Sequence, residues 1–322
     1  MNYFLTIIAL ILAGHQSVSQ SRNLDGFSYM KEDSIGINEQ LSTAKQLYNL
    51  QLYDSVISLT EIILSQSIDG NYIRGVGEAY FLKARGLVRL GRREKAIEMY
   101  HLALERFKSI EDPDRLASAY NNQGILFRAG GDFRAAIQAG EQALQHVSQS
   151  ENNQLKFNIL NNLGNSYQRI ALFKKAGDVY FDALELIQYE SDSLSQLEMR
   201  AEVNINLGLI YLMQRLMDKA LATFHEARLI LETMSLKPQL AAVYFNLGYT
   251  YAENMEDNRA KKYMKLAQEL YEELNDEIGK ALCRRTNGQI YYVKKLFDQA
   301  AKEQQVAVSQ LEELEAFIYL PY

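Results

Sequence analysis

The chain has 322 residues, a formal net charge of −6 and a pI near 5.4, which excludes the basic surface that nonspecific nucleic-acid binding requires. Its single cysteine, Cys283, excludes an intrachain disulfide. Three prolines, no tryptophan and abundant leucine and alanine favour an all-helical protein.

The N-terminus begins with an apolar run at Tyr3–Ala13, which is shorter than the roughly 20 residues that span a bilayer. The run resembles the hydrophobic region of a signal peptide, and Ser17 and Ser19 supply small residues before a cleavage point. We therefore predict a signal peptide at residues 1–19 and export to the periplasm or beyond, with only transient membrane contact. The alternatives are an uncleaved membrane-proximal anchor or a buried N-terminal segment of a cytoplasmic protein.

Residues 20–36 are polar, contain two glycines and carry no helical stripe of apolar residues. This composition predicts a flexible linker between the signal peptide and the first regular element.

A pattern that recurs every 40 residues dominates the rest of the chain, with one spacing of 44 between Gly164 and Gly208. Each unit has a small residue, a large residue three positions later, and mostly alanine 12 and 19 positions later. The small residues, which we define as position 0, are Ala44, Ala84, Gly124, Gly164, Gly208, Gly248 and Gly288. A fixed period in this range predicts stacked repeats that bury their apolar faces against one another. The predicted array covers residues 37–322, with repeats starting near 37, 77, 117, 157, 201, 241 and 281.

Two helices are expected in each unit. In the fourth repeat the first helix is predicted near Phe157–Ile170, followed by a break at Ala171–Phe173. Similar breaks are expected at Gly91, at Gly130–Asp132 and at Asn254–Asp257, because glycine suits a helix end and aspartate caps the next helix. We expect the residue at position +3 to fill the space beside each close helix crossing at position 0.

The order Leu163-Gly164, Tyr167, Ala176, Tyr180 and Ala183 resembles the tetratricopeptide repeat. That family's usual unit has about 34 residues, and the longer unit here resembles varieties found in bacterial signalling arrays. The first repeat departs from the pattern at Val56 and Ile63, and the family's proline at the end of the second helix is absent. The resemblance implies an all-α, right-handed solenoid of about seven helix-turn-helix repeats. It leaves function open, because the fold hosts many partners.

The resemblance also implies that the first helix of each pair lines a concave groove. Position −2 is asparagine in four consecutive repeats, at Asn122, Asn162, Asn206 and Asn246. An amide offers two donors and an acceptor, so a ladder of them would pair with the backbone of an extended peptide. The alternative is that these amides bond neighbouring helices and lock the stack.

Arginines join the amides on the same predicted face. A basic, amide-rich patch inside an acidic protein indicates an acidic or carboxylate-bearing peptide as the partner. The alternative is a set of solvated or internally paired arginines. The lysines of the family's carboxylate clamp are missing, so the resemblance does not extend to recognition of a free C-terminus. The members of the patch are Arg85, Arg89, Arg128, Arg169 and Asn165.

The later repeats place apolar residues at corresponding positions, among them Leu209, Met213 and Tyr249. An apolar half beside a polar half would suit a mixed peptide, unless these residues pack against the array's own second helices.

No catalytic motif, cofactor loop or metal-ligand spacing stands out, so the sequence predicts a binding protein that is not an enzyme, with no cofactor and no metal. Our first hypothesis is that the chain is an exported protein that binds a protein or extended peptide in its groove. The second is a sensory module of a bacterial signal-transduction system, complete or the front part of a longer protein. The third is an intracellular scaffold. The apolar C-terminal tail at Glu315–Tyr322 leaves open a folded-back cap, pairing with another chain or continuation of the protein, and the oligomeric state stays open.

Overall fold

The computed structural model describes residues 26–148, 150–188 and 194–314, and the regular elements in these ranges are all α-helices. None of them has the length and apolar character needed to cross a membrane. The predicted signal peptide at residues 1–19 and the apolar tail lie outside the described residues. The helices are α2 (Gly26–Asn49), α3 (Tyr53–Asp69), α4 (Ile73–Arg89), α5 (Arg93–Ser109), α6 (Pro113–Ala129), α7 (Phe133–Val147), α8 (Asn153–Arg169), α9 (Phe173–Gln188), α10 (Leu194–Met213), α11 (Met217–Met234), α12 (Lys237–Glu253), α13 (Asp257–Glu273), α14 (Glu277–Val293) and α15 (Phe297–Glu313).

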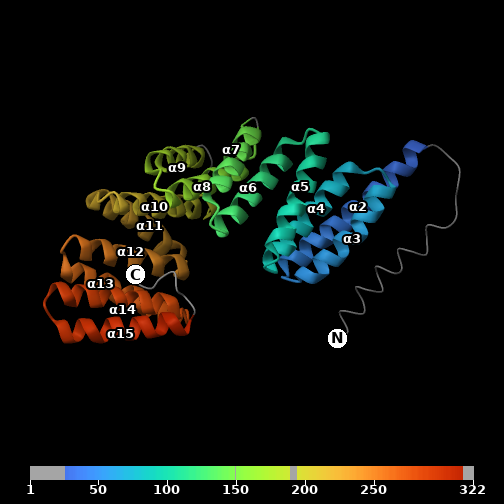
Figure 1. Cartoon of the computed structure of the whole chain (residues 1–322). Helices are drawn as coiled ribbons and strands as arrows, with labels where there is room; N and C mark the ends of the chain where they lie inside the picture. The colour runs from blue at the N-terminus through green and yellow to red at the C-terminus, as the bar shows by residue number, and fades with distance from the viewer. Residues whose placement is uncertain (1–25, 149, 189–193, 315–322) are drawn as a thin grey trace. The chain divides into compact units, whose positions relative to one another are not determined.

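The chain divides into two compact units, Met1–Ala119 and Tyr120–Tyr322, with the boundary inside α6. In the first unit α2, α3, α4 and α5 pack in chain order, and α2 also contacts α4. In the second unit each helix from α7 to α15 packs against the next, and α8, α10, α12 and α14 contact one another in turn. Within this unit α12 to α15 lie as layered rods that alternate in direction (Figure 1). The predicted helical-hairpin architecture is therefore confirmed.

The 40-residue pattern marks the positions that pack most tightly. Position +12 is at most 4% exposed in all seven repeats: Val56, Ala96, Ala136, Ala176, Ala220, Ala260 and Ala300. Position +19 is fully buried throughout, at Ile63, Ala103, Ala143, Ala183, Ala227, Ala267 and Ala307. Because both positions face helix crossings, a small side chain there lets the backbones approach.

The side chain that fills the space at position 0 differs from the expected one. In the fourth to seventh repeats it comes from position +16, on the second helix, and not from the large residue at +3. A Cβ added at Gly164 would lie 2.5 Å from the Tyr180 ring, and one at Gly208 would lie 2.5 Å from the Phe224 ring. Tyr180 and Phe224 are both fully buried. The +3 residue lies one turn along the first helix and instead contributes its carbonyl to the turn that follows.

Each hairpin turns through the same backbone motif. The amide of Leu172 donates to the carbonyl of Tyr167 at 3.0 Å, and the amide of Ala171 donates to Gln168 at 3.0 Å. This is a Schellman arrangement, in which the residue after the helix adopts a left-handed conformation. Ala171 has φ 58°, and the equivalent residues of the other repeats are Gln51, Gly91, Gly131, Arg215, Met255 and Lys295. The predicted breaks at Gly91, Gly130–Asp132, Ala171–Phe173 and Asn254–Asp257 are thus all confirmed.

Two predicted boundaries need correction. The part of the expected linker that is described, residues 26–36, belongs to helix α2. No proline interrupts it, and extending an existing helix adds one hydrogen bond for each residue fixed. The first helices also begin a turn or more before the predicted repeat starts, and polar residues cap two of these ends. Asn152 accepts from the Leu155 amide at 3.0 Å, and Asp276 accepts from the Gly279 amide at 2.9 Å.

Candidate peptide-binding face

The candidate site lies on the first helices of the second unit, at positions +1, +4 and +5 of each repeat. These positions share one side of a helix, since residues three and four apart are neighbours on its surface. We call this set the first-helix face. Two cavities open on it. One is bounded by Ile125, Arg128, Ala129 and Arg169, and the other by residues of α12, α14 and α15.

The first cavity has a volume of about 340 Å³. Helix α6 supplies Ile125, Arg128 and Ala129, and helix α8 supplies Arg169. The structure therefore brings together two of the predicted arginines and lines the space between them with small and aliphatic side chains. We call it the arginine pocket.

Arg128 is half-buried, and its Nε atom is buried without a hydrogen-bond partner. One Nη atom donates to the side-chain oxygen of Asn162 at 3.3 Å. Burial lowers the pKa of the Arg128 guanidinium, and the nearby charge of Arg169 lowers it further. Among the described residues no carboxylate forms an ion pair with either arginine.

Aromatic rings hold the other arginines. The guanidinium of Arg169 lies 5.4 Å from the centre of the Phe133 ring, at position +9 of the preceding repeat. In the first unit Arg89 lies over Tyr53, also at +9, and donates to its hydroxyl at 3.2 Å. Arg85 lies 4.1 Å from the centre of the Tyr48 ring. Cation–π contacts of this kind orient a guanidinium and leave its N–H groups available at the ring edge.

Two members of the predicted asparagine ladder donate to asparagines on the first helix of the preceding repeat. Asn162 donates to Asn121 at 3.2 Å, and Asn206 donates to Asn161 at 2.9 Å, so consecutive first helices are tied together. Asn165 accepts from the Tyr180 hydroxyl at 2.7 Å. These bonds favour the interpretation that Asn162 and Asn206 lock the stack. The proposed binding roles of Asn122, Asn162, Asn206 and Asn246 stay predictions.

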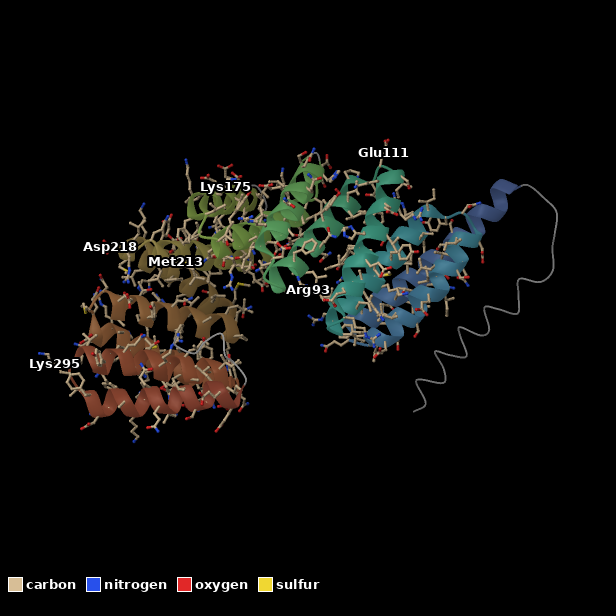
Figure 2. The ribbon with its side chains drawn as sticks, viewed as in Figure 1. Arg93, Glu111, Lys175, Met213, Asp218 and Lys295 are labelled. Carbon is tan, nitrogen blue, oxygen red and sulfur yellow. The ribbon has the colours of Figure 1, made fainter. Side chains whose placement is uncertain are left out.

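The face continues from the arginine pocket into an apolar region. Gln168 contacts the sulfur of Met213 at 3.8 Å, which joins α8 to α10. Met213 is 55% exposed and projects from the end of α10 (Figure 2). On α12 the rings of Phe245 and Tyr249 stack, with their centres 6.4 Å apart. The predicted apolar half thus lies beside the polar half, although Leu209, Phe245 and Tyr249 are also partly packed against the core.

The second cavity, of about 520 Å³, lies at the last hairpin. Tyr292 and Phe297, which are 65% and 57% exposed, meet edge to face in its wall. At position +16 this repeat carries Gln304, where the fourth, fifth and sixth repeats carry Tyr180, Phe224 and Met264, and Gln304 is part of the cavity wall.

The first-helix face offers cationic and amide donors at one end and apolar surface at the other. The described residues hold no group of His, Cys, Asp or Glu side chains positioned for a metal ion. The sequence reasoning missed Ile125, Ala129 and the supporting ring of Phe133. The recurring aromatic at +9, present at Tyr53, Phe133, Phe173 and Phe297, was the signal that pointed to it.

Comparison with known proteins agrees with this architecture. Two tetratricopeptide-repeat models match the chain, at residues 76–149 and 241–274. No curated protein matches it.

Solved structures share the fold. BtubC (BKLC) from P. vanneervenii is 21% identical with a TM-score of 0.59, over 74% of this chain and 92% of that one. A Rap protein complexed with competence and sporulation factor is 14% identical with a TM-score of 0.57, over 88% and 94%. The signal transduction ATPase PH0952 from Pyrococcus horikoshii, which has a tetratricopeptide repeat sensor, is 14% identical with a TM-score of 0.71, over 89% of this chain and 44% of that one.

Proposed function

Because the chain belongs to the tetratricopeptide-repeat family, we propose that its second unit is a binding module that takes an extended peptide or protein segment along the first-helix face. The observation that carries this proposal is the position of the two cavities. They involve different repeats, and each includes residues at positions +1, +4 or +5 of two consecutive first helices. The second cavity is completed by Gly288 and by side chains of helix α15. The residues that the two cavities have in common by position support one binding face along the first helices. The module acts by binding and catalyses no reaction.

The proposed segment carries acidic and apolar side chains. Acidic groups would meet Arg128 and Arg169, and apolar groups would meet Met213 and the second cavity. A structural neighbour, the Rap protein, is itself complexed with competence and sporulation factor, which supports a bound-partner role for this fold.

Selection from a displayed library of random peptides tests the proposal. Selected peptides should bind the wild type and lose about tenfold or more in affinity to Met213→Lys and to Arg169→Glu, since each puts an unfavourable charge on the face. Neither Met213 nor Arg169 takes part in the asparagine hydrogen bonds that tie the first helices together, so we expect both variants to fold. Leu229→Lys, at 56% exposure on the second helix α11, and Arg134→Glu, exposed on α7, are matched controls. Absence of any enriched peptide, or equal binding by all four variants, would refute the proposal.

We also propose that the protein is exported, because the N-terminal run and the small residues at Ser17 and Ser19 have the form of a cleaved signal. Mass spectrometry of the mature protein from its native host should find Gln20 at the N-terminus, and an intact Met1 would contradict export.

A second candidate function is a sensory module of a signal-transduction system. It is favoured by the likeness to PH0952, whose repeats are described as a sensor. In that case the peptides selected above would be signals, and binding would change the activity of an output protein that copurifies with the chain.

A further inference from the structure

We infer that the arginine pocket is a carboxylate-binding subsite of the first-helix face, with Arg128 as the deep charge and Arg169 as the outer one. The inference rests on the proposed function and specifies the chemical group that the ligand presents to the arginine pocket. The expected group is a single carboxylate on a short stem, as in an aspartate or glutamate side chain.

The first support is the position of the unpaired charge. Arg128 is half-buried, yet its buried Nε makes no hydrogen bond and its guanidinium meets no carboxylate among the described residues. A protein with 40 acidic residues has ample choice of partners for an arginine. The lack of one at a cavity wall indicates that the counter-charge comes from a ligand.

The second support is that carboxylates on neighbouring elements are already engaged. Glu202 on α10 accepts from Asn161 at 2.7 Å. Glu141 on α7 accepts from the Tyr167 hydroxyl at 2.7 Å. Asp132 caps α7 by accepting from the Ala135 amide at 3.0 Å. None of these three carboxylates forms an ion pair with Arg128.

The third support is that the donors are held in place. Asn162 accepts from Arg128, and its own amide is fixed by Asn121 at 3.2 Å. Phe133 carries the Arg169 guanidinium on its ring. Two oriented guanidinium groups suit a planar carboxylate, which accepts hydrogen bonds at both oxygens. Ile125 and Ala129 line the remaining wall and suit the aliphatic stem of the ligand's side chain.

Nuclear magnetic resonance of the arginine Nε–Hε groups tests the subsite directly. The Arg128 and Arg169 signals are assigned from their loss in Arg128→Lys and Arg169→Lys. The probes are three N-acetylated tripeptides at constant ionic strength. Two are amidated at the C-terminus, acetyl-Gly-Glu-Gly-amide and acetyl-Gly-Gln-Gly-amide, and the third, acetyl-Gly-Gln-Gly, has a free C-terminus. Inorganic phosphate is titrated as a fourth probe.

We expect saturable shifts of both arginine signals with the glutamate peptide and none with its blocked glutamine counterpart. Saturation with the free C-terminus would identify a terminal carboxylate as a second source of the same chemistry. Arg169→Gln should weaken glutamate binding about tenfold or more, and Arg134→Gln should leave it unchanged. Arg169 is exposed, so its replacement keeps the test valid even if Arg128→Gln unfolds.

Equal shifts with glutamate and blocked glutamine peptides, no shifts at all, or saturation by phosphate alone would overturn the inference. The outcome is separable from the proposed function. If library-selected peptides lose affinity to Met213→Lys but not to Arg169→Gln, the first-helix face binds peptide and the carboxylate subsite is wrong.

Discussion

Replacing Gly164 by alanine tests the packing argument at its tightest point. The new Cβ would lie 2.5, 2.7 and 2.9 Å from three atoms of the Tyr180 ring, all inside van der Waals contact. The ring is fully buried and its hydroxyl is bonded to Asn165, so it has no free direction in which to move. Overpacking of this kind costs about 1–3 kcal/mol, whereas alanine's better helix propensity returns about 1 kcal/mol. We expect a lower free energy of unfolding.

Gly177→Ala is the matched control. Gly177 also lies inside a helix, but nothing lies within 4 Å of its added Cβ, so the variant should gain up to about 1 kcal/mol. Urea denaturation followed by circular dichroism measures both variants. Their difference isolates the overpacking, because the propensity gain is common to the two. If Gly164→Ala is as stable as Gly177→Ala, position 0 is not a close crossing and the reasoning fails.

Three further predictions follow from single residues. Ala171→Gly should raise the urea midpoint by the equivalent of roughly 1 kcal/mol, because φ of 58° is strained for alanine; an unchanged midpoint would contradict this. Burial holds the pKa of His225 below its ordinary 6.5, so the unfolded state binds more protons just below that pH. Stability should therefore fall as pH falls through 6.5, and His225→Gln should flatten that slope in urea midpoints measured from pH 5 to 8. Burial raises the pKa of the fully buried Cys283 thiol to about 12, so Ellman's reagent should label it only after denaturation, and fast labelling of the native protein would refute this.

The fold could be predicted from the sequence because the packing contacts recur with the 40-residue period. Every position that the pattern marked as small at +12 and +19 is buried, since helix crossings recur at fixed intervals along the chain. The sequence was insufficient for contacts between repeats. No spacing rule reveals that Asn162 bonds to Asn121 or that Phe133 supports Arg169, because such bonds depend on rotamers and on the offset between stacked helices.

The ends of the helices were the second feature that could not be predicted from the sequence. The predicted repeat starts lie at a constant distance before each small residue, whereas the helices begin earlier, as α8 does after its cap Asn152. The left-handed residue of each turn was equally hard to read. Glycine marks it at Gly91 and Gly131, but the backbone forces the same conformation on ordinary residues such as Arg215.

The 40-residue pattern that determines the fold also separates the positions used for packing from the positions proposed for binding. Positions +12 and +19 are constrained at every repeat because a larger side chain there would push two helices apart. Positions +1, +4 and +5 carry no such constraint, so their chemistry changes from repeat to repeat. In the second unit it passes from Arg128 and Arg169 through Met213 to Tyr292. A substitution at an exposed position of this face, such as Arg169 or Met213, should cost little stability. The proposed ligand, laid along the first helices of this unit in chain order, would therefore meet cationic donors first and apolar surface last.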